Sequence, residues 1–351
     1  MGKAQHLTVL VTGTGSALGV SIFKAFRQSR LRPRIVATDA DPRSAGLFRA
    51  DAAYVLPRVA EVEDLYLRRL EEICLRERVS TVCFGSEIEM RRMAPRIQDF
   101  ERATGARLVL NEPRFLDALL DKWHMTCRLR ERDLPVPDTV PVADAEAVRS
   151  FVTRNAFPYV LKPRDGSGSK GKFVLRSQAE LEFFSRYVPN AVLQEYLFPD
   201  DEEYTVGIYK SPRTGYVGQI VFRRALGAGL TYKAEVVFDD EIEAVCRRVV
   251  ESFDIWGPIN IQLRKTAAGV RIFEINLRFS SSTVMRASFG FNEAELCLRD
   301  LVLGEAIARP AVRPGLCLRY WDEVYVAPED HLRLRETGHA PEPRGVKLDD
   351  F

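Results

Sequence analysis

Short apolar, β-branched runs recur through the first 110 residues, at 7–11, 34–37, 79–84 and 107–110. Runs that are apolar at every position are typical of parallel strands buried on both faces. Segments with helical spacing of apolar residues lie between the runs, as in 65–74, where Glu and Arg occupy most other positions. Alternating strands and helices predict a doubly wound α/β domain.

The pattern changes after the turn signal Asn111-Glu112-Pro113. A helical segment follows to about residue 132, where Leu134-Pro135-Val136-Pro137 stops it. Beyond residue 138, short strands follow one another with few helices between them, which predicts an α+β module with antiparallel sheets. The expected strands are 159–162, 191–194, 204–208, 216–220, 260–263 and 270–274.

Two helices are expected among these strands, at about 239–253 and 292–303. The segment after residue 309 contains one plausible strand pair within about 316–326, followed by a charged, proline-containing end. These changes of pattern divide the chain into 1–112, 113–308 and a C-terminal extension, 309–351.

Composition narrows the class of protein. The chain has 351 residues, of which 46% are hydrophobic, and its 51 basic and 49 acidic side chains give a net charge of +2. This material suits a globular protein of more than one domain, and the balanced charge disfavours binding to nucleic acid or to an anionic membrane. The longest charge-free stretch, 4–23, is interrupted by glycine, threonine and serine, so it predicts neither a membrane span nor a secretory signal.

Cysteine and histidine spacing argues against a disulfide framework and a zinc site. The six cysteines include no CxxC pair, and the four histidines lack the close pairing of metal ligands. We therefore expect reduced, mostly structural cysteines and a cytoplasmic protein.

A glycine-rich turn, Gly13-Thr14-Gly15-Ser16-Ala17-Leu18-Gly19, follows the first predicted strand. It is compatible with two interpretations. In a dinucleotide site, Asp39 or Asp41 would accept the ribose hydroxyls about 20 residues further on. In a tight strand-to-helix turn, glycine is needed only for a positive φ. The first interpretation leaves an NAD(P)-binding oxidoreductase as an alternative function.

A second glycine-rich segment, 160–171, offers a stronger signal. Lys162 ends an apolar strand, and the loop after it contains three glycines and two serines. A lysine with several backbone N–H groups can surround a polyphosphate, although the order differs from that of a Walker loop. A flexible surface hairpin would not need a lysine among buried apolar residues, so we favour phosphate binding.

A third feature is the alternation in 271–278. On a strand, Glu274, Asn276 and Arg278 would share one face, while Phe273, Ile275 and Leu277 would face the core. Gln262 could join the polar face from the neighbouring strand. Such hard oxygen donors suit Mg²⁺ bridging nucleotide phosphates, with Arg278 holding the phosphoryl group. A solvated strand face would show the same alternation, but asparagine and glutamine have modest strand propensity.

Together these features resemble the ATP-grasp superfamily, in particular stand-alone members similar to the ATP-binding halves of the carbamoyl-phosphate synthetase large subunit. The resemblance covers about residues 5–305. It implies an N-terminal Rossmann-like domain over 1–112 and a two-lobed ATP-grasp module over 113–308, with a hinge near 195–198.

The resemblance also implies roles for individual residues. Lys122 and Lys162 match the two nucleotide lysines, and 165–171 looks like the mobile lid over the phosphates. One departure is Asn276-Leu277-Arg278, where many relatives read Asn-Pro-Arg; leucine keeps the alternation, so the site is still expected. The implied nucleotide ligands are Lys122, Lys162, Gly166, Ser167, Gly168, Ser169, Gln194, Glu195, Leu197 and Glu203; the metal ligands are Gln262, Glu274 and Asn276, and the catalytic residues are Arg278 and Lys162.

The activity implied by the resemblance is ATP-dependent ligation of a carboxylate to an amine, or to a thiol, through an acyl phosphate, with release of ADP and phosphate. The implied cofactors are ATP and Mg²⁺, with Mn²⁺ as a substitute, and the partners are a small acid and a small amine. A homodimer is left open, and a nucleotide-binding module without turnover is a further alternative. Because ATP-grasp enzymes join many acids and nucleophiles, neither substrate follows from the sequence.

Overall fold

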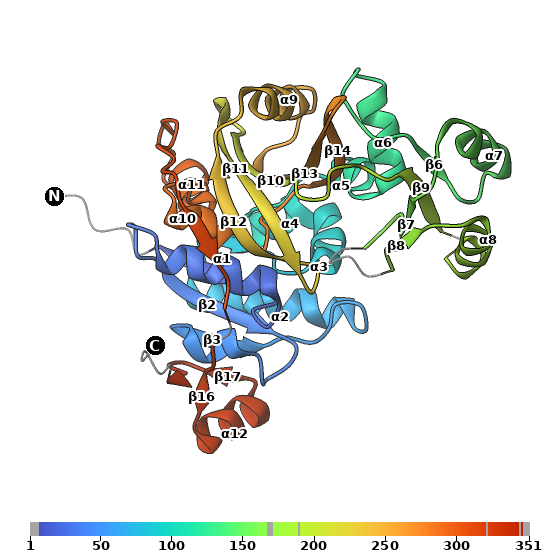
Figure 1. Ribbon diagram of the computed structural model, residues 1–351. Helices are drawn as coiled ribbons and strands as arrows, with labels where there is room; N and C mark the ends of the chain where they lie inside the picture. Colours follow the sequence, from blue (N-terminus) through green and yellow to red (C-terminus); the bar gives the residue numbers. More distant parts are fainter. Residues whose placement is uncertain (1–6, 167–170, 189, 321, 344, 347–351) are drawn as a thin grey trace.

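The apolar runs of the N-terminal third form a parallel sheet, as their pattern predicts. The computed structural model describes residues 7–166, 171–188, 190–320, 322–343 and 345–346. The strands pair in the order β3-β2-β1-β4-β5, and the central strands are buried on both faces. Figure 1 shows the beginning of the chain in blue, with β2 and β3 labelled. Their bounds are β1 Thr8–Val11, β2 Arg34–Asp39, β3 Ala52–Val55, β4 Thr81–Cys83 and β5 Arg107–Leu108.

Helices cover this sheet, and two of them begin or end at a residue suited to that place. Ser16 caps α1 by accepting from the Gly19 N–H, and Gly105 ends α4 in a left-handed conformation. The predicted doubly wound α/β domain is therefore present. Its helices are α1 Ala17–Arg27, η1 Ala45–Arg49, α2 Glu63–Glu77, α3 Glu87–Met93, η2 Ala94–Arg96 and α4 Ile97–Thr104.

The glycine-rich turn between β1 and α1 packs within the domain itself. Gly13 has a φ of +58°, which favours glycine. The Gly15 N–H donates to Asp39 Oδ2 at 2.7 Å, and Asp41 is ion-paired with Arg43 at 3.0 Å. Both carboxylates suggested as ribose acceptors thus already have partners, which supports the interpretation as a tight turn.

Two helices lead from this domain into a small antiparallel sheet. Pro113 starts the first helix. Asp121 lies between the two helices and caps the second by accepting from the N–H groups of Trp123 and His124, each at 2.9 Å. The sheet has the strand order β6-β9-β7-β8 and forms the first lobe. The bounds are α5 Pro113–Leu120, α6 Lys122–Arg130, β6 Thr139–Pro141, α7 Ala145–Arg154, β7 Tyr159–Pro163, β8 Phe173–Leu175, α8 Gln178–Tyr187 and β9 Ala191–Glu195.

The second lobe is a larger antiparallel sheet in the order β14-β13-β10-β11-β12-β15. Its two faces are both buried, because Val221 belongs to the cluster that includes α9 and the next residue, Phe222, to the cluster that includes α10 and α11. The bounds are β10 Glu203–Ser211, β11 Gly215–Gly227, β12 Leu230–Val237, α9 Asp240–Glu251, β13 Gly257–Thr266, β14 Gly269–Asn276, α10 Thr283–Ser288, α11 Glu293–Cys297 and η3 Leu298–Val302.

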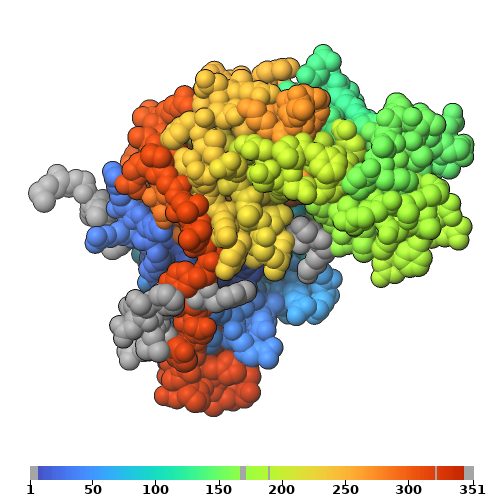
Figure 2. Space-filling model, in the orientation of Figure 1, coloured from blue at the N-terminus to red at the C-terminus, as the bar shows by residue number. Residues whose placement is uncertain are grey.

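The C-terminal extension contacts both parts of the molecule, and the expected strand pair within 316–326 is wrong. Both strands form, but β15 pairs with β12 and β16 with β18, while β17 joins the N-terminal sheet antiparallel to β3. Each strand pairs with an available sheet edge rather than with the strand next to it in the sequence. Figure 2 shows this segment in red along one face of the molecule. The bounds are β15 Leu316–Leu318, β16 Tyr325–Val326, α12 Pro328–Thr337, β17 His339–Ala340 and β18 Gly345–Val346.

The states of the cysteines and the lengths of the helices can be compared with the expectations from composition. All six cysteines are free, and four of them are buried. Every helix among the described residues is too short or too polar to cross a membrane.

A fully buried ion pair lies behind the large sheet. Arg286 and Glu293 are 2.9 Å apart, and neither side chain is exposed. Arg286 also donates to Asn260 Oδ1 of β13 and, at 3.2 Å, to Thr205 Oγ1 of β10. A Cβ at residue 207 would lie 2.5 Å from the guanidinium, so only glycine leaves room for it. The pair therefore supports the centre of the sheet from one side.

Removing one charge of this pair is expected to be strongly destabilising. Glu293→Gln should lower the free energy of unfolding by about 3–5 kcal/mol, because it leaves Arg286 buried without a counter-charge. Glu251→Gln, in the exposed pair with Arg247, serves as the control and should cost about 0.5 kcal/mol or less. Urea unfolding of both variants measures the difference, and similar small losses would contradict a structural role for the buried pair.

Candidate active site

A cleft lies between the two lobes and gathers most of the residues singled out in the sequence. Its walls come from β7 and β9 of the first lobe and from β10, β11, β13 and β14 of the second. The chain segment that carries Glu274 continues to Asn276 and Arg278. The described residues do not include Ser167, Gly168 and Ser169. Among the lining residues are Lys122, Lys162, Gly166, Lys172, Gln194, Glu195, Tyr196, Leu197, Glu203, Arg224, Gln262, Arg264, Phe273 and Glu274.

Lys162 is a buried cation at the junction of the lobes. Its Nζ donates to Gln194 Oε1 at 3.1 Å and to the Phe273 carbonyl at 3.2 Å, so it joins β9 of one lobe to β14 of the other. Burial lowers the pKa of Lys162 from its usual value to about 7, although the Glu274 carboxylate acts in the opposite direction. An anionic ligand in the cleft would stabilise the charged form.

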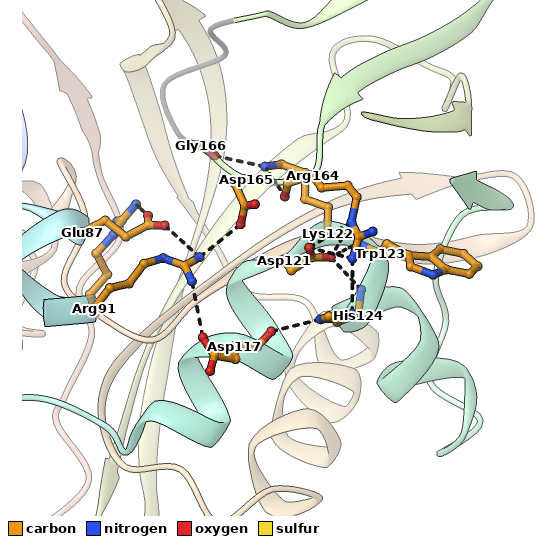
Figure 3. Close-up of polar contacts among 11 residues, drawn as sticks. Glu87, Arg91, Asp117, Asp121, Lys122, Trp123, His124, Arg164, Asp165 and Gly166 are labelled. Atoms are coloured by element: carbon orange, nitrogen blue, oxygen red, sulfur yellow. Dashed lines mark hydrogen bonds and ion pairs between the residues drawn. The ribbon is translucent and has the colours of Figure 1, made fainter. Parts of the chain in front are cut away.

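Lys122 donates hydrogen bonds to the start of the second glycine-rich segment. Its Nζ donates to the Gly166 carbonyl at 3.0 Å and lies 3.4 Å from the Arg164 carbonyl (Figure 3). Arg164 in turn pairs with Asp121 at 2.9 Å and lies 3.2 Å from His124 Nε2. The first predicted nucleotide lysine thus lies at the cleft and contacts the loop that follows β7.

A β-bulge changes which side chains of β14 reach the cleft. The pairing of β13 with β14 shifts between Gln262/Glu274 and Leu263/Ile272, so Phe273 is the extra residue. Phe273 and Glu274 therefore both line the cleft, whereas Ile275 and Leu277 are in the core. The expectation that Phe273 faces the core is wrong, because strict alternation fails at a bulge.

Gln262, Glu274 and Asn276 form the polar face that the sequence predicts. The amide nitrogens of Gln262 and Asn276 both donate to Glu274 Oε1, at 3.0 and 2.8 Å, and Gln262 Oε1 accepts from Arg224 at 2.6 Å. Within the described residues, these contacts use one carboxylate oxygen of Glu274. The described residues contain no cluster of three His, Cys, Asp or Glu that could hold a metal. One carboxylate and two amides fit Mg²⁺, which binds few protein oxygens and keeps water or phosphate ligands.

Glu203 is flanked by two arginines that the sequence analysis missed. Arg264 lies directly across from Glu203 on β13 and donates to it at 2.7 Å, while Arg224 on β11 donates at 2.8 Å. Both arginines lower the pKa of Glu203, although burial acts to raise it. Arg224 also contacts Gln262, so it connects Glu203 to the polar face. No local motif identifies these arginines, because only the strand register brings them to Glu203.

The hinge residues lie at the cleft, and several of their polar groups already have partners. Gln194 accepts from Lys162 and donates to Thr139 Oγ1 at 2.8 Å. Glu195 Oε1 accepts from the Asp138 N–H at 2.8 Å, and the Leu197 carbonyl accepts from Arg264 at 2.6 Å. These contacts fix the strand at the point where the chain passes between the lobes.

Arg278 lies where β14 leads towards the N-terminal domain. Burial lowers its pKa, and the carboxylates of Glu87 and Glu274 act in the opposite direction. Its Nη2 is 3.9 Å from Glu87 of α3, and its Nε has no hydrogen-bond partner among the described residues. A buried guanidinium with an unused donor is suited to an anion.

Comparison with known proteins agrees with this architecture. Residues 187–324 match the family described as ATP-grasp in the biosynthetic pathway with Ter operon, and residues 9–107 match the PylC-like N-terminal domain. The chain thus resembles the ATP-grasp superfamily over residues 187–324. The expected fold class and the expected resemblance to the ATP-grasp superfamily are confirmed.

Individual relatives are distant. N5-carboxyaminoimidazole ribonucleotide synthetase from Thermus thermophilus superposes with a TM-score of 0.68 at 18% identity, covering 97% of this chain and 92% of that chain. Pyruvate carboxylase of Bacillus subtilis is 26% identical over 61% of this chain, and D-alanine–D-alanine ligase of Fusobacterium nucleatum 21% over 53%. The chain spans only 18% and 60% of the lengths of these last two proteins.

The lowered pKa of Lys162 predicts a pH-dependent stability. Between pH 7 and 10.5 the unfolded chain holds a proton that the folded chain has released, so the free energy of unfolding should rise with pH across that window. Relative to Lys162→Met, the wild type should gain about 2 kcal/mol between pH 7 and 9. Denaturant unfolding at several pH values measures this gain, and parallel profiles for the two proteins would contradict it.

Proposed function

We propose that this protein is an ATP-dependent ligase that joins a small carboxylic acid to an amine, or to a thiol, through an acyl phosphate. The observation that carries the proposal is the cleft itself. Buried Lys162 lines it from the first lobe, Gln262 and Glu274 line it from the second, and Asn276 is hydrogen-bonded to Glu274. A cation facing hard oxygen ligands is the arrangement that a metal-bound polyphosphate requires.

The nucleotide would bind along the cleft from the hinge to the polar face. Gln194, Glu195 and Leu197 would receive the adenine, and Glu203, held ionised by its two arginines, would accept from the ribose hydroxyls. Lys162 would contact the phosphates, since a polyanion restores the charge that burial disfavours. Lys122 and the backbone of Gly166 would complete this end of the site.

The metal would be held by Glu274 and Asn276, with Gln262 as the third donor. Mg²⁺ bound there would neutralise the charge of the phosphates, and Mn²⁺ prefers the same kinds of donors. Arg224 contacts the amide oxygen of Gln262, so it would compete with the metal for that atom.

The proposed reaction has two steps. An oxygen of the acid attacks the γ-phosphorus of ATP, the bond to the β-phosphate oxygen breaks, and ADP leaves. Lys162 and Arg278 would stabilise the negative charge of the phosphoryl group during this transfer. The nucleophile then attacks the acyl carbon, phosphate leaves, and the nitrogen or sulfur loses its proton.

The substrates we expect are small molecules, because the proposed site is a cleft between the two lobes rather than an extended surface. A homodimer is part of the proposal; one structural relative, a biotin carboxylase domain with a TM-score of 0.67, is itself described as a dimer.

Glu274→Gln is expected to weaken binding of metal-bound nucleotide. The substitution removes one negative charge from the proposed metal site while keeping the shape of the side chain. The rise in melting temperature that Mg-ATP produces should shrink, and the Mg²⁺ dependence of ATP binding should move to higher concentration. Calorimetric titrations over a range of Mg²⁺ concentrations measure this shift. Glu251→Gln, whose carboxylate lies outside the cleft, is the control. An unchanged Mg²⁺ dependence in Glu274→Gln would remove this residue from the metal site.

An acyl phosphate should be trapped by hydroxylamine. With a panel of acids and hydroxylamine in place of the amine, one acid should yield ADP, phosphate and its hydroxamate in equal amounts. Lys162→Met and Arg278→Met should each reduce all three products by about a hundredfold or more, because each removes a charge that the phosphoryl group needs. Quantifying nucleotides and hydroxamate in the same reaction tests the mechanism. Acid-dependent formation of AMP and pyrophosphate would exclude it, because attack would then occur at the α-phosphate.

A further inference from the structure

Arg91 of α3 lies at the centre of an ion-pair network beside the cleft. Its guanidinium is 3.6 Å from Glu87 on its own helix, 3.5 Å from Asp117 of α5 and 3.2 Å from Asp165 after β7 (Figure 3). One side chain of the N-terminal domain therefore contacts the helices that lead into the ATP-grasp module and the start of the glycine-rich segment. The sequence analysis did not single it out.

The network continues from Glu87 to the proposed phosphoryl site. Glu87 is shared between Arg91 and Arg278, the latter at 3.9 Å. The contacts run in the order Asp165, Arg91, Glu87, Arg278. The two ends of this series come from different lobes, because Asp165 follows β7 of the first lobe and Arg278 follows β14 of the second.

Among the described residues 164–166, Asp165 is the one that contacts the N-terminal domain through this arginine. The neighbouring contacts of 164–166 involve Lys122, Asp121 and His124, all from α6 or its cap. Arg91 thus adds a contact from the N-terminal domain to residues 164–166, which already contact α6 and its cap.

The charges indicate what Arg91 does for Arg278. Glu87 lies between two guanidiniums, with Oε1 3.6 Å from Arg91 and Oε2 3.9 Å from Arg278, so its attraction to Arg91 opposes a closer approach of the carboxylate to Arg278. Without Arg91, Glu87 would pair with Arg278 alone, and an incoming phosphoryl group would have to displace it. The ion pairs of Arg91 are themselves partly exposed, so they should contribute little to global stability.

We propose that Arg91 is a positioning residue for phosphoryl transfer: by sharing Glu87, it keeps Arg278 available to the terminal phosphate, and by pairing with Asp165 it fixes the segment that follows β7. This inference rests on the proposed function, because it assigns Arg278 to that phosphate. It adds a residue of the N-terminal domain to the machinery of the ATP cleft.

The test compares affinities for Mg-ATP and Mg-ADP, so it requires no knowledge of the acid. Arg91→Gln should weaken Mg-ATP binding by roughly three- to tenfold more than Mg-ADP binding, since only ATP carries the terminal phosphate. Arg91→Lys, which keeps one positive charge without the guanidinium fork, should fall between that variant and the wild type. Arg92→Gln is the matched control, because Arg92 is the next residue on α3 and pairs with Glu63 instead. Isothermal titration gives both affinities, and melting temperatures should agree to within a few degrees.

A second substitution separates positioning from a general structural role. Adding Glu87→Gln to Arg91→Gln should restore most of the preference for ATP, because it removes the carboxylate that would occupy Arg278. An ATP-to-ADP affinity ratio in Arg91→Gln equal to that of Arg92→Gln would overturn the proposal, as would a double variant no better than the single one. If the wild type binds neither nucleotide, the proposed function is wrong, and so is the role proposed for Arg91. Binding by the wild type with no effect of Arg91 refutes only the present inference.

Discussion

The central constraint of this structure is the burial of the Lys162 ammonium where the two lobes meet. A buried cation is unfavourable unless oxygen atoms replace the water it has lost. Those oxygens come from Gln194 of the first lobe and from the Phe273 carbonyl of the second, so the lobes must meet for the charge to be satisfied. The same burial lowers the pKa of Lys162, and an anion in the cleft would stabilise its charged form. One interaction therefore links the arrangement of the lobes to the proposed chemistry.

Strand register builds the rest of the cleft around this lysine. The bulge in β14 presents Phe273 and Glu274 to the same side, and the pairing of β10 with β11 and β13 brings two arginines to Glu203. Behind the sheet, Arg286 and Glu293 are buried as a pair. The polar groups thus depend on cross-strand neighbours rather than on water, which ties the electrostatics of the site to the integrity of the sheet.

The N-terminal domain is connected to this module by polar side chains and by the returning chain. Glu87 and Arg91 of α3 reach towards Arg278 and Asp165, and β17 adds the C-terminal segment to the N-terminal sheet. The extension therefore contacts both parts of the molecule, with β15 on the large sheet and β17 on the parallel one. These contacts place a helix of the N-terminal domain next to the proposed phosphate path.

The sequence by itself determined the elements and the chemical types at the cleft. Apolar runs with glycine and proline boundaries indicate strands and turns, because burial and backbone geometry act locally, and Lys162, Glu274 and Asn276 were identified because polar residues within apolar strands require partners. Only the tertiary structure decided the contacts and pairings that depend on strand register and on sheet edges. Arg224 and Arg264 reach Glu203 only through pairing, Phe273 turns to the cleft only because of a bulge, and β15 and β16 join different sheets because each strand pairs with whichever edge the folded chain leaves open.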